Sequence, residues 1–395
     1  MPLAVYLLGV AIFAQGTSEL MIAGLLPEMA ADLGVSVPDA GLLISGFAVG
    51  MLVGAPLLAV LTLRWPRRTA LLAFMAVFAA THVAGALTSS YGVLLVSRVV
   101  GAFVYAGFWA VAAATAIGLV PENARGRAIS VVAGGLTVAT LIGLPLGTLV
   151  GQQFGWRAAF WAVAVLSTLS AAGVWATIPG TARGEGRTGA LRDQLRALVR
   201  PAMWLAVGTT ALSTSGLIAV FAYLSAMLVE HTGVASAWVS GVLALYGLGA
   251  LTGITLGGRV ADRWPFALLF AGLTGMTLVS AGFALGSQTV WAVAPLALLL
   301  GVFGFALNPA LNTRVFALAA GAPTLAASWN VAAFNVGITA GPWLGGVALD
   351  AGLGYASIGW IGAAFALAAM VTVALSRAAA RPAVQPVPET AGRAS

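Results

Sequence analysis

Apolar residues fill this chain in long runs, and short polar turns separate one run from the next. Each run is about 20 residues or longer, which is enough for one helix to cross a lipid bilayer. We therefore expect an all-α membrane protein with twelve transmembrane helices. Their expected ranges are 3–26, 40–63, 69–89, 91–118, 127–151, 157–178, 203–229, 237–258, 266–286, 289–312, 325–349 and 354–376.

The second run recurs, altered, in the second half of the chain. Gly50–Pro66 aligns with Gly249–Pro265 when one is shifted by 199 positions, since 249 − 50 = 199. The two segments share two glycines, two leucines and the run Arg-Trp-Pro at their ends. A repeat at half-length predicts two homologous six-helix bundles, which is the construction typical of secondary transporters.

Polar segments divide the chain accordingly. The first bundle is expected over residues 1–178 and the second over 203–376, with a linker at 179–202 that contains five arginines. Residues 377–395 are rich in Ala, Pro and Arg and are expected to be a disordered tail. The N-terminus has no basic region ahead of its apolar run, so we expect a first transmembrane helix and no cleaved signal.

Charge placement predicts the orientation. With the N-terminus in the cytoplasm, the cytoplasmic loops, linker and tail hold every arginine except Arg98 and Arg157. Cytoplasmic loops of membrane proteins carry such an excess. The net charge of +7 therefore reflects topology, and we expect no nucleic-acid partner. Both termini are expected in the cytoplasm, in a multi-pass protein of the plasma (inner) membrane.

Glycines recur at every fourth position in four of the expected helices, and residues four apart share one helix face. Small residues there allow two helices to approach closely in lipid. One interpretation is static helix packing. The other, which four such sets at equivalent places favour, is an interface along which the two halves rock. The sets are 46/50/54, 143/147/151, 249/253/257 and 337/341/345.

Several of these segments resemble signatures of the major facilitator superfamily. Gly258–Arg263 matches its loop pattern of a glycine, three residues and an Asp-Arg pair, although Leu63 replaces the aspartate in the first-half copy. Gly143–Gly147 is a variant of the glycine-proline signature associated with antiporters, and Gly341–Gly346 is closer to it. Arg98 stands where many proton-coupled members have an arginine in the fourth helix.

The first sixty residues narrow this resemblance. Gly16–Leu20, Gly24–Ala30 and Gly54–Leu57 look like the drug:proton antiporter branch, and are most similar to its chloramphenicol-resistance exporters. Relatives that export sugars or nucleosides share much of this pattern. The resemblance implies alternating access, a small amphipathic drug as substrate, protons as the coupling ion, and gating by Arg64, Arg68, Asp262 and Arg263. It also implies hinge or interface roles for Gly143, Pro145, Gly147, Gly341, Pro342 and Gly345.

Glu19 is the only acidic residue that we place inside an expected span. A charge there costs at least about 2.5–3.5 kcal/mol on insertion scales, so it usually marks a functional group or a paired one. We expect Glu19 to bind and release the coupled proton, with Arg98 as its companion at the same depth on the fourth helix. For each, a purely structural role is the alternative that the sequence leaves open.

Uncharged polar and aromatic side chains on the expected cavity helices are candidates for substrate contact. These are Gln15, Tyr105, Phe108, Trp109, Phe221, Tyr223, Asn308, Asn312 and Asn335. Buried amides can instead tie helices together, and most aromatic residues in such chains face lipid or the core. His82 has the chemistry of a proton relay, but lies on the third helix, where we favour a structural histidine.

Other function classes fit less well. The chain has no cysteine and two separated histidines, so we expect no metal and no cofactor. No Gly-x-Ser-x-Gly or His-Glu-x-x-His motif suggests an enzyme, and no Thr-Val-Gly-Tyr-Gly filter suggests a channel. A passive uniporter needs no buried acid. A proton symporter remains open from the residues, whereas the resemblance favours export. We expect a monomer.

Overall fold

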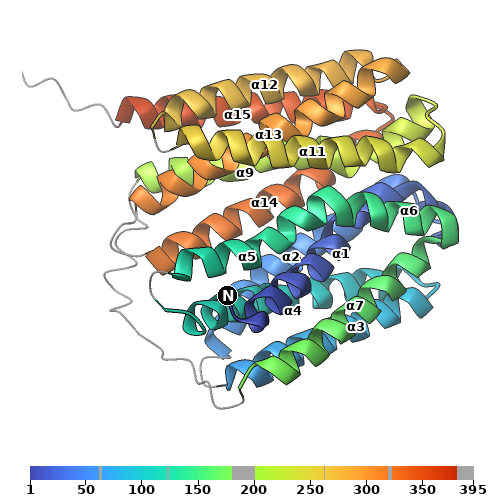
Figure 1. Ribbon diagram of the computed structural model, residues 1–395. Helices are drawn as coiled ribbons and strands as arrows, with labels where there is room; N and C mark the ends of the chain where they lie inside the picture. The colour runs from blue at the N-terminus through green and yellow to red at the C-terminus, as the bar shows by residue number, and fades with distance from the viewer. Residues whose placement is uncertain (62–64, 122–123, 180–200, 262, 319–322, 380–395) are drawn as a thin grey trace, which may run out of the picture.

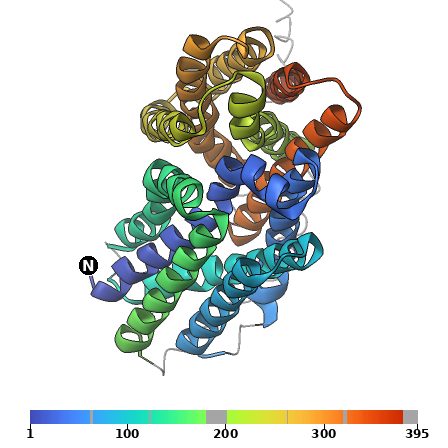
Figure 2. The same ribbon diagram turned by 90° about the vertical axis from the view of Figure 1, so that its right-hand side faces the viewer.

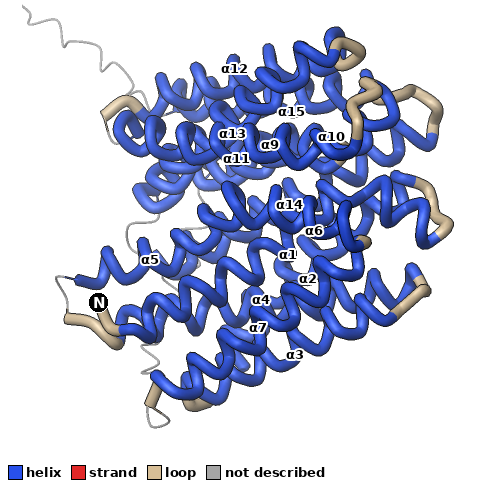
Figure 3. Tube along the Cα trace, turned by 45° about the vertical axis from the view of Figure 1, so that its right-hand side comes forward, coloured by secondary structure: helices blue, strands red, loops and turns tan. Residues whose placement is uncertain are grey.

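This computed structural model describes residues 1–61, 65–121, 124–179, 201–261, 263–318 and 323–379, and the described elements are helices joined by short turns (Figure 3). Twelve spans within these ranges are long and apolar enough to cross a membrane, which confirms the expected number. The linker at 180–200 and the tail at 380–395 lie outside the described residues.

The first half contains six spans. They are α1 (Leu3–Leu33), α2 (Val37–Leu61), α3 (Arg67–Leu87), α4 (Tyr91–Gly118), a fifth span formed by α5 (Arg125–Val138), η2 (Ala139–Gly143) and α6 (Leu144–Phe154), and α7 (Trp156–Thr177). η2 is a π-helical turn. It ends two residues before Pro145, whose missing N–H cannot continue the regular hydrogen-bond ladder.

The second half repeats this order. It contains a seventh span of α9 (Pro201–Ala222), α10 (Leu224–Ala226) and the π-helical η3 (Met227–His231), then α11 (Ser236–Ala261) and α12 (Pro265–Gly286). α13 (Val290–Leu318), α14 (Pro323–Asp350) and α15 (Ala356–Ala379) complete it. Several helices extend beyond their expected ranges; α1 continues to Leu33, where Gly34 closes it in a left-handed conformation (φ 65°).

The two halves form two adjoining bundles of nearly parallel helices (Figures 1 and 2). Where they meet, α14 packs along α2, and α11 packs against η2 and α6. We call the end of the molecule where α1 ends and α2 begins the far end, at the right of Figure 1. The near end is the one where α1 begins, at the left.

Side chains in matching positions support the duplication. Phe47 and Tyr246 differ by 199 positions, since 246 − 47 = 199, and each packs its ring against an aromatic ring of its own half. The ring centroids are 6.0 Å apart for Phe47 and Tyr105, and 6.1 Å apart for Tyr246 and Phe305. The repeat seen in the sequence is therefore also a repeat of tertiary contacts.

The far end holds the named contacts between the halves. Ser225 donates a hydrogen bond to the Ala23 carbonyl, and Ser45 donates one to the Thr339 carbonyl at 3.0 Å. The Tyr223 ring lies against Gly41, and the Gly346 backbone approaches Pro38. Because these residues all lie in the far half of their helices, this conformation is closed at the far end.

Candidate functional site

Glu19 lies in the middle of α1 and is partly buried. Its carboxyl group interacts with the Tyr105 hydroxyl and with the charge of Arg98, both from α4. The sequence therefore places Arg98 correctly at the depth of Glu19. The two side chains do not form a direct ion pair, since no described nitrogen of Arg98 lies within 4.0 Å of the Glu19 carboxylate.

Arg98 is almost completely buried, with 2% of its surface exposed. Its Nη1 donates a hydrogen bond to the Ser18 hydroxyl at 2.7 Å, and its Nη2 donates to the Ser18 carbonyl at 3.1 Å. The guanidinium carbon also lies 4.2 Å from the centroid of the Phe47 ring, a cation–π contact. Arg98 is therefore held by α1 and α2 while it faces the acid.

Ser18 and His82 are the functional candidates that the sequence leaves out of its site. The Ser18 hydroxyl lies 2.5 Å from Nε2 of His82, and Nδ1 of His82 lies 2.7 Å from the Phe78 carbonyl. Both residues are buried. The only signals in the sequence are that Ser18 adjoins Glu19 and that a histidine interrupts an apolar span, and neither identifies the partner.

The aromatic candidates separate into three groups. Tyr105 lies beside Glu19, and Trp109 donates from its indole nitrogen to the Tyr105 hydroxyl at 3.3 Å. Phe221 stacks on Tyr246 at 4.5 Å in the second half. Phe108 has no exposed surface and belongs to the hydrophobic core. Tyr105, Phe108 and Phe221 are therefore all core residues in this conformation, and Trp109 is the one of these four side chains that is partly exposed.

Tyr223 does not lie with the central residues, contrary to the expectation that it contacts substrate. Its hydroxyl donates to the Pro342 carbonyl at 2.8 Å, and its ring packs against Gly345. It also adjoins Gly41 and Gly346, so it sits in the contact between the halves at the far end. Tyr223 therefore closes the far end in this conformation.

The amides likewise differ from one another. Asn330 donates to the Asn312 side chain at 2.8 Å and accepts from Thr210 at 3.1 Å, which joins α14, α13 and α9. Asn312 also donates to the Asn308 carbonyl, and Asn308 itself is partly buried. Asn312 therefore ties helices together. In this conformation its side chain is engaged in that network and not free for a ligand.

Two of the candidate amides keep buried polar atoms without a hydrogen-bond partner among the described residues. Gln15, with 1% of its surface exposed, leaves both its side-chain oxygen and its nitrogen unpaired. Asn335 donates to the Val331 carbonyl, but its oxygen Oδ1 is unpaired. A buried polar atom without a partner costs about 1–3 kcal/mol. Gln15 and Asn335 are therefore available for the polar groups of a ligand.

The glycines expected between the halves instead pack within each half. A Cβ on Gly143 or Gly147 would meet Thr17 or Met21 of α1, and one on Gly341 would meet the backbone of α9 at Ser215. Gly345 lies against Tyr223 and Ile358, also in its own half. The glycine spacing correctly indicates close helix contact, but the hypothesis of a sliding interface between the halves is wrong for these sets.

The expected hinge prolines interrupt two spans. Pro145 is the second residue of α6, which follows the π-helical turn η2, and Pro342 lies inside α14, where its carbonyl accepts a hydrogen bond from Tyr223. Of the expected gating residues, Arg64 and Asp262 lie outside the described residues. The Arg68 charge lies 5.2 Å from the Trp175 ring centroid, and Arg263 is exposed in the turn between α11 and α12.

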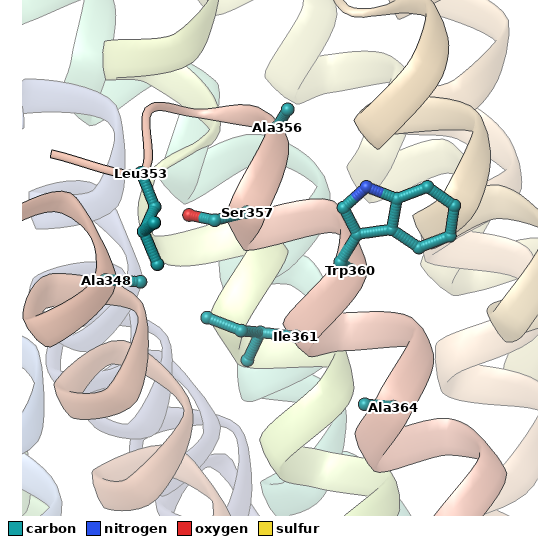
Figure 4. A pocket seen from close by; sticks show the side chains of 7 residues that line it. All are labelled: Ala348, Leu353, Ala356, Ser357, Trp360, Ile361 and Ala364. Carbon is teal, nitrogen blue, oxygen red and sulfur yellow. The ribbon is translucent and has the colours of Figure 1, made fainter. Parts of the chain in front are cut away.

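A groove of about 560 Å³ lies elsewhere, on the far part of α14, the start of α15 and the loop between them (Figure 4). Its lining consists of Ala348, Leu353, Ala356, Ser357, Trp360, Ile361 and Ala364. None of these side chains titrates near neutral pH, and none belongs to the site around Glu19. The groove is therefore separate from the chemistry described above.

Comparison with known proteins decides the family. The family model described as "Major Facilitator Superfamily" matches residues 8–324. The chain belongs to the major facilitator superfamily. It is 45% identical to a "Chloramphenicol resistance protein" of Streptomyces lividans over 379 residues, which cover 95% of each chain. It is 33% identical to the "Inner membrane transport protein YdhP" of Escherichia coli K12, covering 93% of this chain and 94% of that one.

A solved structure shares the fold of this superfamily member. The chain is similar to a bacterial homologue of the human lysosomal transporter Spinster in an inward-facing, unoccupied conformation, with a TM-score of 0.70 and 17% identity. The match covers 95% of this chain and 94% of that chain. The protein is thus a multi-pass membrane transporter of two homologous six-helix bundles, and the family it belongs to is one of transporters, not of enzymes.

Proposed function

We propose that this transporter exports small amphipathic drugs such as chloramphenicol in exchange for protons. The single observation that carries the proposal is Glu19, an acid in the middle of a membrane span, held beside Arg98 and Tyr105. Alignment over almost the whole length with a chloramphenicol resistance protein supports the substrate. Trp109, which is partly exposed, offers an aromatic face, and Gln15 and Asn335 offer unpaired amide atoms for such a ligand.

The orientation follows from the arginines. We place the near end, both termini and the linker at 179–202 in the cytoplasm, since the loops there contain most of the arginines. The far end then faces outward, and the contacts that close it support assignment of this structure to an inward-facing conformation. The likeness to an inward-facing solved structure supports the same assignment. Arg64, Arg68, Asp262 and Arg263 would gate the cytoplasmic loops in the opposite conformation.

The exchange then takes the following course. Drug enters the central site from the cytoplasm or inner leaflet, and its binding favours release of the Glu19 proton inward. Rocking of the two bundles, which separates Ser225 from Ala23 and Ser45 from Thr339, exposes the site outward. Glu19 takes up a proton there, drug binding weakens and the drug leaves. Because one carboxyl serves both ligands in turn, net movement of one requires net movement of the other.

Drug-induced proton movement tests the proposal. In energised inverted vesicles, where the interior is acidic, adding chloramphenicol is expected to collapse part of the preformed pH gradient. Vesicles from cells with empty vector should show no change. If vesicles that contain the protein stay silent with chloramphenicol but respond to a sugar or nucleoside, the substrate is wrong and the coupling is right. Silence with all of them would contradict the proposal.

The two asparagines provide a matched pair of variants. Asn335→Ala removes an unpaired oxygen, so we expect it to raise the KM for drug several-fold with little effect on thermal stability. Asn312→Ala leaves a buried Asn330 nitrogen without its acceptor, which should cost about 1–3 kcal/mol of stability. Drug uptake and thermal melting of both purified variants check this. Equal effects of the two variants on both properties would show that the structure assigns them wrongly.

A further inference from the structure

A chain of hydrogen bonds runs from α3 through α1 to the guanidinium on α4. It links the Phe78 carbonyl, the His82 ring, the Ser18 hydroxyl and Arg98. The His82 ring is packed between aromatic rings, with centroids 4.3 Å from Phe78 and 5.5 Å from Phe160. His82 is 2% exposed, so the ring has little freedom to turn. Nothing in the exchange described above uses this histidine.

The chemistry of the donors and acceptors determines where each hydrogen lies in this chain of hydrogen bonds. Arg98 can only donate, so the Ser18 oxygen accepts from it. Nδ1 of His82 lies 2.7 Å from a carbonyl oxygen and must carry a hydrogen. A second proton on Nε2 would place two positive charges together away from water, which is costly. The Ser18 hydrogen therefore points to Nε2, and His82 is the neutral Nδ1–H tautomer and an acceptor.

This arrangement determines what Arg98 can reach. Both of its terminal nitrogens are taken up by Ser18, and no ion pair with Glu19 forms even though the two charges interact. Among the described residues, the charged and titratable groups that face Glu19 are Arg98 and Tyr105, both on α4. His82 on α3 lies farther away and is connected through its hydrogen bond with Ser18. An Arg98 released from Ser18 would have Glu19 as its natural partner.

We propose that His82 and Ser18 are positioning residues that hold Arg98 away from direct pairing with Glu19. The inference rests on the proposed function, because it concerns the acid that carries the proton. With the hydrogen bond between His82 and Ser18 intact, the Glu19 carboxyl can gain and lose a proton within each cycle. Without that hydrogen bond, Arg98 binds the Glu19 carboxylate directly and keeps it ionised. The step in which the empty transporter returns with a proton then fails.

The positioning role is tested by comparing the rates of two kinds of transport in the same variants. Net drug transport driven by a pH gradient needs Glu19 to take up a proton, whereas exchange of labelled for unlabelled drug needs only the ionised, drug-bound form. Both are measured with purified protein in proteoliposomes. Loss of a hydrogen bond to a charged group changes such an equilibrium about tenfold or more, so His82→Phe and Ser18→Ala should lower net transport by that factor. Drug–drug exchange should stay near the wild-type rate.

Further variants sharpen the comparison. His82→Gln restores an acceptor toward Ser18 and should recover most of the net transport. The double variant Ser18→Ala/His82→Phe should be no worse than either single variant, since both break the same chain. Ser170→Ala is the matched control for a buried serine, because within the described part of the chain its hydroxyl bonds to the Leu166 carbonyl of its own helix alone. If His82→Phe does not fold, Ser18→Ala and His82→Gln still carry the test.

Several outcomes would overturn the inference. Wild-type net transport in His82→Phe and Ser18→Ala would do so, and so would an equal loss of net transport and exchange, which is the mark of a structural defect. Additive losses in the double variant would show two independent effects. Glu19→Gln, measured in parallel, separates the two claims: if it still couples drug to protons, the proposed function itself fails, whatever the histidine variants do.

Discussion

Glu19→Gln is expected to abolish proton movement induced by drug. The amide has the shape of the protonated acid, so it preserves the contacts of α1 with α4, but it can neither bind nor release a proton. In energised inverted vesicles, the response to chloramphenicol should fall to that of vesicles without the protein. The protein should still insert and fold, because Glu19 forms no ion pair with another described residue that the substitution would break.

Glu28 offers a control on the same helix. It is a partly buried acid of α1 near the far end, where it interacts with Gln152 and lies away from Arg98. Glu28→Gln should therefore retain the proton response to drug. If Glu19→Gln still moved drug against its gradient at the expense of protons, Glu19 could not be the coupling site. Loss of coupling in both variants would also argue against a specific role for Glu19.

Substitution by alanine is expected to have different effects at two glycines of α11. A Cβ on Gly247 would lie 2.5 Å from the Thr140 carbonyl oxygen and 2.9 Å from the Leu141 Cα, across the contact between the halves. A Cβ on Gly253 would lie 2.2 Å from the Val302 carbonyl oxygen, within the second half. Both neighbours are backbone atoms, so neither clash can be relieved by a side-chain rotation.

Gly247→Ala should therefore disfavour the far-closed conformation while each half stays folded. Overpacking costs about 1–3 kcal/mol, which shifts an equilibrium between two conformations about 5- to 150-fold. Gly253→Ala should instead lower thermal stability and the yield of folded protein. Drug transport and thermal melting of the two purified variants distinguish these effects.

Accessibility labelling gives an independent measure of the Gly247 effect. The chain has no native cysteine, so one cysteine at Leu243, which lies against Gly24 across the contact, is a clean reporter. Gly247→Ala should increase its labelling by an impermeant maleimide added from outside. Unchanged labelling together with lowered stability would mean that Gly247 serves packing alone.

The architecture could be predicted because it depends on local patterns. The transmembrane spans can be predicted from apolar runs because the thickness of the bilayer sets their length. The segment at 50–66 repeats at 249–265 because the two halves share one fold. Spacing by four correctly marks the glycine faces as close contacts. It does not identify the neighbouring helix, because a face is a property of one helix and its partner is set by the packing of all of them.

Local sequence patterns predict only part of the candidate site. Glu19 and Arg98 stand out as charges in apolar spans, and their depth follows from helix geometry. Ser18 and His82 do not, since a serine hydroxyl is cheap to bury by bonding to its own helix. Their role depends on α3 and α4 both meeting α1 at one level. Asn312 and Asn335 look alike in the sequence, but only the fold shows which amide has a partner.

Transport by the purified protein, with no other protein present, tests the central claim most directly. Proteoliposomes are given an acidic interior and labelled chloramphenicol outside, and drug accumulation and internal pH are followed together. The account predicts that drug accumulates above its external concentration while protons leave, and that both stop when a protonophore abolishes the gradient. Drug that only equilibrates across the membrane, with no matching proton flux, would contradict proton antiport.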